Sequence, residues 1–549
     1  MATYYYAEGG TAADKESATS GTYPGGCMSP ATCNSESSGF SPGDFVLASD
    51  QGGDIRLTLG AGCADGTNGS EITWGAKVGE SPIINGADII TGWTVYSGSV
   101  YQATVTTQPQ QVFIDESFGD RKASIGECVG DLDWYWASNV LYLYCSTGDP
   151  DTEYTSPGVE ASQRLLGLSI NSDYIIVDGV DARFTNRTGI GGQQAGNNVL
   201  VKNCLSEWNW YTGIAPASSG TTYTDWTIED NVCRYNGVGG IALGIIVDDC
   251  TIRRNTCYEN GKYQPAGNSY DEEQYKWSFG IKVFEDTVGS GIEIYENVCY
   301  SNGRGEAGDQ AGAGCGIWFD HCTATALNPN LAYSNFCYDN CGIGIFIEIS
   351  SYCYVFGNVL WDNAIAGMSG WPANIVVDCR ISFTTENNLV YNNTCVGGQY
   401  GLRVGAYQLE AGMSISDNSF VNNIFVGATE QQCWVYYGGD NDQTHGSGNL
   451  YSANCFGAES TGFLWVGGGP KQDTYEAFLS AMNANENIQP DNNWEDDPVF
   501  EDESNHKYWL SSSDTGGIGT AIDLGGSFSI GMLPLSMPGN VLTSNRDNY

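Results

Sequence analysis

The chain has 549 residues, of which 65 are Asp or Glu and only 21 are Lys or Arg, so its formal net charge is −44. A surface of that sign repels phosphate backbones, which excludes nucleic acid as an expected partner. The three histidines are not at helical ligand spacing, which argues against a His-based zinc site. We expect no bound cofactor, although the many carboxylates leave Ca²⁺ open, because hard cations prefer oxygen ligands.

The opening residues MATYYYAEGG have neither the basic start nor the apolar middle of a signal peptide. No apolar run reaches the roughly 18 residues that a membrane-spanning helix needs, so we expect no membrane span. We expect an extracellular protein, either one whose signal is absent from this sequence or one released in a phage particle by lysis. Homo-oligomerisation and assembly into a virion both remain open.

Residues 1–110 contain FSPGDFVLASDQGG and ITWGAKVGESPIINGADIITGW, which predict strands and turns that start a solenoid. The 73 glycines are about twice the usual share and favour short strands with tight turns. The 19 cysteines are many for a chain of this length. Three pairs are close enough in sequence to form local disulfides: Cys27 with Cys33, Cys128 with Cys145, and Cys315 with Cys322.

A phrase of the form T-I-x-x-N-x-C-x-x-N, followed by G-I, recurs from about residue 200 onward. It appears, for example, as TIEDNVCRYNGVGGI (227–241), IEIYENVCYSNG (292–303) and SISDNSFVNNIFVG (414–427). Short strands with period-two alternation and Asn/Gly turns at a fixed repeat predict the coils of a parallel β-helix. The fold class is therefore all-β, a parallel β-helix with a strand-rich N-terminal start and a C-terminal cap.

Stacked coils place equivalent residues above one another, so the repeat predicts two ladders. The first is an asparagine ladder formed by Asn231, Asn255, Asn297, Asn335 and Asn358. The second is an inward column of small buried side chains, which we expect to be neither disulfides nor metal ligands: Cys233, Cys257, Cys299, Cys337 and Leu360.

The G-I marks give the spacing of successive coils. They align Ile190, Ile214, Ile241, Ile281, Ile317, Ile345, Met368 and Leu402. Loops in 258–279 and 303–314 lengthen two of the coils and precede the strands of interest. We expect 1–110 to form the N-terminal strands, 111–440 the β-helix, and 441–549 a cap. The cap includes a short helix in DTYEAFLSAMN, with Asp473 and Glu476 in a capping box.

Two neighbouring coils end an apolar run with a carboxylate. Aligning GIKVF (280–284), GIWFD (316–320) and GIFIE (344–348) places Asp320 and Glu348 at the same outward position. Strands about 4.8 Å apart would hold the two carboxyl groups roughly 5 Å apart, the separation typical of retaining glycosidases. We therefore expect these two residues to be catalytic. Calcium binding, a structural role and a different register are the alternatives.

The neighbouring outward positions suit a sugar. Aromatic faces pack on pyranose rings, and cations bind hydroxyls or an acidic sugar. The expected substrate-binding residues are Lys282, Phe284, Trp318, Phe346, Trp371 and Arg403.

The motifs GIWFD, NLAYSNFCYDN and IFIEIS resemble the β-xylosidase family of right-handed parallel β-helix hydrolases. The resemblance implies Asp320 as nucleophile and Glu348 as acid/base. The segments HCTATALNPN after Asp320 and SSYC after Glu348 depart from the family pattern, so xylose is not implied as the substrate. The opening MATYYYAEGG also resembles the starts of phage tail and tailspike β-helix proteins.

These observations predict a carbohydrate-active protein, a retaining glycoside hydrolase acting on a polysaccharide or oligosaccharide. One alternative is a non-enzymatic phage-tail or surface protein that binds polysaccharide. A further alternative is a polysaccharide lyase, with Lys282 as its base.

Overall fold

The structure is a computed structural model that describes residues 1–61, 64–192, 196–216, 222–263, 277–285, 289–303, 314–364, 372–379, 383–406, 414–436, 446–457, 465–466, 472, 474–484, 488–491 and 493–510. It confirms the all-β parallel β-helix. The chain divides into two compact units. Unit 1 comprises 1–242 with 259–277, and unit 2 comprises 243–258 with 278–549.

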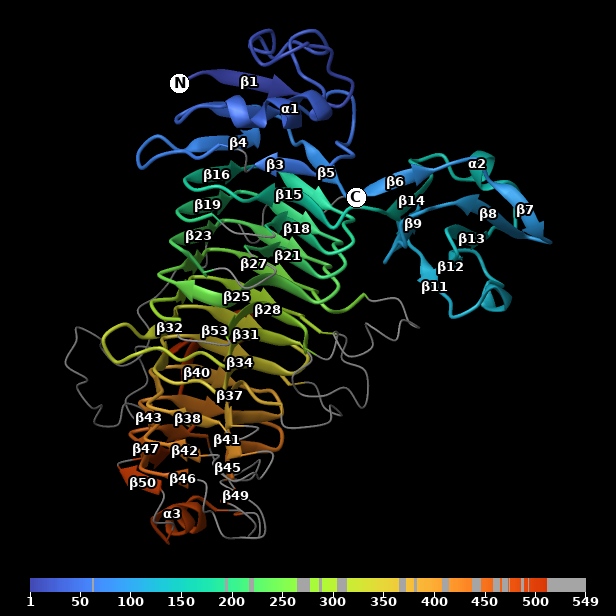
Figure 1. Cartoon of the computed structure of the whole chain (residues 1–549). Helices are drawn as coiled ribbons and strands as arrows, with labels where there is room; N and C mark the ends of the chain where they lie inside the picture. The colour runs from blue at the N-terminus through green and yellow to red at the C-terminus, as the bar shows by residue number, and fades with distance from the viewer. Residues whose placement is uncertain are drawn as a thin grey trace. The chain divides into compact units, whose positions relative to one another are not determined.

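Unit 1 is built from three parallel sheets that the chain visits in turn in each coil (Figure 1). The first contains β1 (Thr3–Tyr6), β2 (Phe45–Ala48), β4 (Ile72–Ala76), β16 (Ile175–Asp178), β19 (Val199–Lys202) and β23 (Trp226–Glu229). The second contains β5 (Ile83–Asn85), β17 (Asp181–Arg183), β20 (Leu205–Glu207) and β24 (Val232–Arg234). The third contains β3 (Leu59–Ala61), β15 (Leu166–Ile170), β18 (Thr188–Gly191), β21 (Thr212–Ala215) and the start of β25 (Gly239–Asp248). Unit 1 also contains strand β22 (Thr222–Thr224), which pairs with β25, and helix α1 (Pro30–Glu36).

A small β-domain is inserted into unit 1 between β5 and β15, which the sequence analysis did not single out. One sheet contains β6 (Ala87–Ile90), β9 (Val112–Ile114), β10 (Ser117–Phe118) and β14 (Val159–Ser162). The other contains β7 (Thr94–Ser97), β8 (Val100–Thr104), β11 (Asp120–Arg121), β12 (Asp133–Ala137) and β13 (Val140–Tyr144), and helix α2 (Pro150–Glu153) precedes β14. The two sheets share a core around Trp134, Leu141 and Val159.

Unit 2 repeats the three-sheet coil. Its first sheet contains β26 (Thr251–Arg253), β29 (Glu293–Tyr295), β32 (Asn330–Tyr333), β35 (Cys353–Phe356), β39 (Leu389–Tyr391), β43 (Ser419–Val421), β47 (Asn449–Ser452) and β50 (Ile488–Asp491). The second contains β27 (Thr256–Tyr258), β30 (Val298–Tyr300), β33 (Phe336–Tyr338), β36 (Val359–Trp361), β40 (Thr394–Val396), β44 (Ile424–Val426), β48 (Cys455–Phe456) and β51 (Trp494–Glu495). The third contains β28 (Phe279–Glu285), β31 (Cys315–Asp320), β34 (Ile343–Glu348), β37 (Ile375–Cys379), β41 (Tyr400–Ala406), β45 (Gln431–Tyr436) and β49 (Trp465–Val466).

Shorter elements join these sheets. A three-stranded sheet contains β38 (Thr384–Glu386), β42 (Ser414–Ser416) and β46 (Gly446–Ser447), and a hairpin joins β52 (Phe500–Asp502) to β53 (Lys507–Leu510). Helix α3 (Tyr475–Ala484) lies in the segment where a helix was expected. The Thr474 hydroxyl, 3.2 Å from the Ala477 amide nitrogen, accepts its hydrogen bond and caps the helix, whereas Asp473 lies outside the described residues. A capping box needs Glu or Gln three residues after the capping residue. With Thr474 as the cap that position is Ala477, so Glu476 does not complete a capping box.

The turn between the first and second sheets explains the repeated phrase. One residue takes a left-handed conformation, such as Glu296 (φ 56°) or Gly357 (φ 60°), and an asparagine follows it. Each asparagine then bonds to the next coil: Asn297 Nδ2 lies 3.0 Å from Asn335 Oδ1, and Asn335 Nδ2 lies 3.0 Å from Asn358 Oδ1. The ladder predicted for unit 2 is therefore confirmed and satisfies buried backbone groups at every turn.

The last asparagine of the phrase forms a second ladder that the sequence analysis missed. Asn302 Nδ2 donates to Asn340 Oδ1, and Asn340 Nδ2 donates to Asn363 Oδ1, each at 2.9 Å. Two asparagine ladders thus hold the two ends of the short strands β30, β33 and β36 in the second sheet.

The inward cysteine column is confirmed within unit 2. Cys257, Cys299, Cys337 and Leu360 are successive strand partners and fully buried. All 18 cysteines of the described residues are free and buried. The three local disulfides left open by sequence spacing are therefore absent, because each of those thiols packs as a small apolar group.

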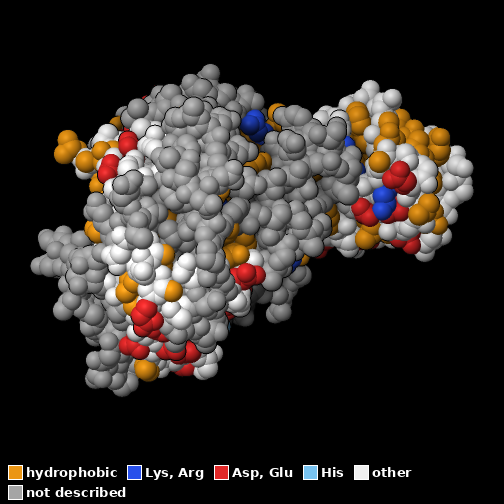
Figure 2. Space-filling model, turned by 90° about the horizontal axis from the view of Figure 1, so that it is seen from below, with side chains coloured by type: hydrophobic (Ala, Val, Ile, Leu, Met, Phe, Trp, Pro, Cys, Tyr) orange, Lys and Arg blue, Asp and Glu red, His pale blue; other side chains and the backbone are white. Residues whose placement is uncertain are grey.

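Acidic side chains are scattered over the face shown in Figure 2, where basic ones are few, as the charge predicts. Among the helices of the described residues, none is long and apolar enough to span a bilayer.

Candidate active site

The third sheet of unit 2 carries a row of carboxylates. Asp320 on β31 is the direct partner of Glu348 on β34, and Glu348 is the direct partner of Asp378 on β37. Phe284 precedes this row and Gly405 follows it. The alignment of Asp320 with Glu348 expected from the two glycines is present. The row also holds a third acid, and we call Asp320, Glu348 and Asp378 the carboxylate row.

The strands of the row are anchored in the core. The core residues beside the acids, such as Phe319 and Ile347, are fully buried. His321 and Ile349 adopt left-handed conformations directly after the acids. Their amides continue the ladder by donating to the Glu348 and Asp378 carbonyls, each at 3.0 Å. The spacing between the acids is therefore set by the sheet, about 4.8 Å per strand.

Each end of the row has a cation. The Lys282 ammonium lies 2.7 Å from Asp320 Oδ2, and the Arg403 guanidinium lies 3.7 Å from Asp378 Oδ2. Glu348 stands between two carboxylates that each have a cationic partner. Adjacent like charges in a sheet repel, and the two cations offset part of the repulsion along the row.

The aromatic residues expected to face solvent do not. Trp318 and Phe346 stack with ring centroids 5.3 Å apart, yet they are only 1% and 0% exposed. Lys282 lies over Trp318, 3.4 Å from its ring centroid, which is a cation–π contact. The expectation of an open aromatic face is therefore wrong for these two residues. Phe284, at 37% exposure, is the aromatic of this set that solvent reaches among the described residues.

Exposure rises along the row. Asp378 is 0% exposed and Glu348 is 5% exposed, whereas the side chains of Asp320 and Lys282 are each 14% exposed. The row therefore has a closed end at Asp378 and a more accessible end at Phe284. The expectation that both predicted catalytic acids face open solvent is wrong.

The register predicted beyond Ile345 is wrong. The next strand places Ile375, not Met368, beside Ile345, and Leu402 follows Ile375. The position expected for Trp371 on the row of Phe346 is held by Val376, and Trp371 itself lies outside the described residues. Arg403 follows Val376 on that row.

Asp378 is the site residue that the sequence analysis missed. The segment NIVVDC (374–379) has the same apolar run and terminal acid as GIWFDHC and GIFIE, but Asn374 replaces the glycine. Because coils were aligned on G-I, the strand was skipped. Aligning on the apolar run and its acid instead would have found it.

The loops expected to border the site, 258–279 and 303–314, lie largely outside the described residues. Within the residues that the structure describes, no group of three or more His, Cys, Asp and Glu side chains is placed to hold a metal ion. Burial raises the pKa of the Cys379 thiol beside the row, and the Asp378 charge adds to this, which makes it a poor nucleophile.

Comparison with known proteins supports the architecture. No protein-family model matches the chain, and no curated protein matches it. The solved complex of XylC with xylose superposes with a TM-score of 0.54 at 12% identity, covering 90% of this chain and 82% of that one. At such identity the likeness shows the fold alone.

Two more distant structures also match. One is described as a glycoside hydrolase, with a TM-score of 0.39 at 9% identity, covering 90% of this chain and 96% of that one. The other is the A-module of the mannuronan C-5 epimerase AlgE6 of Azotobacter vinelandii, with a TM-score of 0.42 at 13% identity, covering 80% of this chain and 94% of that one.

Proposed function

We propose that this protein is a carbohydrate-active enzyme, a glycoside hydrolase that acts with retention through Asp320 and Glu348. The observation that carries the proposal is the direct pairing of these acids on adjacent strands, with Lys282 bound to Asp320. Adjacent strands match the roughly 5 Å that a retaining pair needs. The likeness to a structure with bound xylose agrees with a sugar substrate but does not choose the sugar.

In this proposal the Asp320 carboxylate attacks the anomeric carbon while Glu348 gives its proton to the glycosidic oxygen, so the leaving sugar departs as an alcohol. Glu348, now a carboxylate, takes a proton from water. The resulting hydroxide attacks the anomeric carbon, breaks the bond to Asp320 and restores both acids. Lys282 binds the Asp320 carboxylate and so holds the nucleophile in place. We propose that the sugar enters at the Phe284 end, where exposure is greatest.

The third carboxylate favours one second candidate, an inverting hydrolase. Asp320 and Asp378 lie two strands apart, about 9.6 Å by strand spacing, near the upper end of the range that leaves room for a water. Asp378 is fully buried beside Arg403, so we favour the retaining pair. Proton NMR of the first product formed separates the two: an unchanged anomeric configuration supports retention, and a reversed one contradicts it.

The two other hypotheses lose support from the site. A lyase that uses Lys282 as base must first remove this ammonium from Asp320 and from the ring of Trp318. A binding protein that uses an aromatic groove needs exposed ring faces, whereas Trp318 and Phe346 are buried. Products with new ultraviolet absorbance would revive the lyase. Binding without release of reducing ends would revive the binding protein. We propose an extracellular site of action, where polysaccharides are found.

A further inference from the structure

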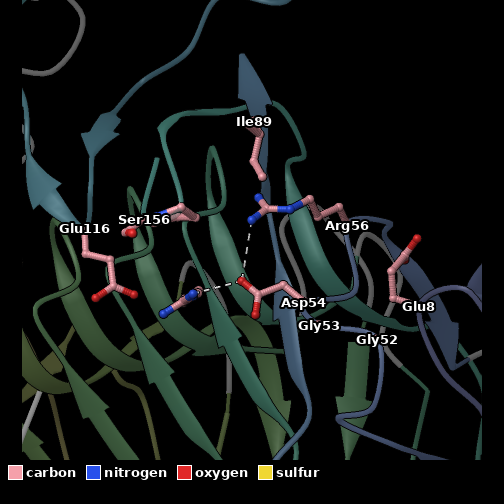
Figure 3. A pocket seen from close by; sticks show the side chains of 10 residues that line it. Glu8, Gly52, Gly53, Asp54, Arg56, Ile89, Glu116 and Ser156 are labelled. Atoms are coloured by element: carbon pink, nitrogen blue, oxygen red, sulfur yellow. Dashed lines mark hydrogen bonds and ion pairs between the residues drawn. The ribbon is translucent and has the colours of Figure 1, made fainter. Parts of the chain in front are cut away.

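A second polar site lies in unit 1, where the inserted β-domain meets the first coils. A cleft of 640 Å³ opens there, within the range usual for small-molecule sites. Its lining includes Asp54, Arg56, Ile89, Glu116, Ser156 and Arg183. Figure 3 shows Asp54 and Arg56 reaching into the middle of the view, with Glu116 on the opposite side and Ile89 above. None of these residues belongs to the carboxylate row.

The floor of the cleft is a fixed ionic network. Asp54 Oδ2 is bound by the Arg183 guanidinium at 2.8 Å, and Arg56 binds Glu160 Oε1 at 2.7 Å. Asn85 Nδ2 donates to both Asp54 (2.8 Å) and Glu160 (2.9 Å), which joins the two pairs. Since Glu160 is fully buried, the arginines are held in place before any ligand arrives, and little ordering is lost on binding.

The arrangement of charged groups in the cleft does not suit an ionic ligand of either sign. Two arginines face Glu8, Asp54 and Glu116 in the lining, so its formal charge is 2 − 3 = −1, and Glu160 behind it adds one more negative charge. A phosphate or uronate would meet arginines that are already neutralised. A divalent cation would meet carboxylates separated by guanidinium groups, and the described residues hold no cluster that fits one.

The remaining hydrogen-bonding capacity fits hydroxyl groups. The Arg183 guanidinium lines the cleft, its side chain is 17% exposed, and one of its five N–H groups donates to Asp54, which leaves further donors. The Glu116 carboxylate, on an exposed turn, is an acceptor. A hydroxyl both donates and accepts, so it can bridge such a pair as neither a cation nor an anion can. Ile89, at 43% exposure, offers apolar area for C–H groups.

We propose that this cleft binds a neutral saccharide unit, separately from the carboxylate row. Vicinal hydroxyls would donate to Glu116 and accept from Arg183, while the ring packs against Ile89. This proposal does not depend on Asp320 or Glu348, and the protein would hold glycan at two sites.

The test uses the full chain carrying Asp320→Asn, so that bound glycan is not hydrolysed. The probes are an array of neutral oligosaccharides, then calorimetry with the best neutral ligand, with digalacturonate and with inorganic phosphate. Glu116→Ala and Ile89→Ala alter the cleft without touching the ionic network, and Glu153→Ala removes an exposed acid elsewhere on the inserted domain. Thermal unfolding of each variant shows that it folds.

We expect a neutral oligosaccharide to bind, with affinity reduced about tenfold by Glu116→Ala and left unchanged by Glu153→Ala. The proposal would be overturned if no neutral glycan on the array bound, or if Glu116→Ala bound the neutral ligand as tightly as the protein with an intact cleft. Tighter binding of digalacturonate or phosphate than of the neutral ligand would also overturn it. Since Glu348→Gln should leave this binding intact, failure of this site and failure of the proposed hydrolase are distinguishable.

Discussion

Asp320 and Glu348 are direct partners on the adjacent parallel strands β31 and β34, and Lys282, on the preceding strand β28, binds the Asp320 carboxylate at 2.7 Å. Two acids and one cation are thus held by strand register alone. The first prediction concerns the chemistry of this pair.

Asp320→Asn and Glu348→Gln should each lower glycoside hydrolysis by about a thousandfold or more, because each removes a group that the reaction needs. The assay is release of reducing ends from a panel of glycans. Circular dichroism and thermal unfolding should match the unaltered protein. Phe284→Leu, which keeps an apolar side chain at the exposed end of the row, is the matched control for folding. We expect it to raise KM modestly and to leave most of the activity. Full activity in either acid variant would end the hydrolase proposal.

The buried pair of Asp378 and Arg403 makes a separate prediction about stability. Asp378→Asn should lower the free energy of unfolding by about 3 kcal/mol or more, because it leaves a guanidinium that is 2% exposed without its carboxylate. The double variant Asp378→Asn with Arg403→Met should recover part of that loss. Denaturant unfolding of the two single variants and the double variant checks this. Additive losses would show that the two groups do not interact.

The asparagine ladder should be a main source of coil stability. Asn335 donates from Nδ2 to Asn358 Oδ1 (3.0 Å) and to the Ile294 carbonyl (2.9 Å), and its own Oδ1 accepts from Asn297. Asn335→Ala leaves several buried groups unsatisfied, so we expect a loss of several kcal/mol at about 1–3 kcal/mol for each group. Denaturant unfolding measures it. Leu331→Ala, a partly exposed position on β32, serves as control and should lose clearly less.

The inserted domain carries a pH-dependent ion pair. Burial by itself would raise the pKa of the Asp133 carboxyl, but the Lys122 ammonium at 3.0 Å and the amides of Val129 and Gly130 outweigh it and lower the pKa. A lowered carboxyl pKa contributes stability above the unfolded value, near 3.9, and this is lost as pH falls through the folded value. Asp133→Asn should therefore destabilise at pH 7 and have little effect near pH 2.

Thermal unfolding of Asp133→Asn across that pH range is the measurement. Asp120→Asn is the control, since Asp120 binds the same lysine but its side chain is 56% exposed, so its effect should be small at every pH. An equal loss at pH 2 and pH 7 would contradict the linkage.

The cysteines should be unreactive in the folded protein. Burial raises the pKa of the thiols of Cys33, Cys204 and Cys433, and the described cysteines form no disulfide. We expect a thiol reagent to label them only after unfolding, and a reductant to leave the melting temperature unchanged. A drop in melting temperature on reduction would show that disulfides form after all.

The sequence by itself determined the coil. The recurring N-x-C-x-x-N phrase fixes the turn asparagines, the inward column and the step from Asp320 to Glu348, because each depends only on alternation along a strand and on stacking of identical turns. The same reasoning failed at Met368. Its coil has no G-I mark, and pairing there is decided by which apolar run, Ile375–Val377, fills the interior.

Only the tertiary structure decided the environment of the acids. Strand alternation states that Trp318 and Glu348 point outward, but not whether other parts of the chain exclude solvent from them, and both are nearly buried. The cations beside the row, the third acid Asp378 and the cleft between Arg183 and Glu116 join residues from separate strands or domains. Such contacts depend on side-chain reach and on packing between segments far apart in the chain, which no local pattern encodes.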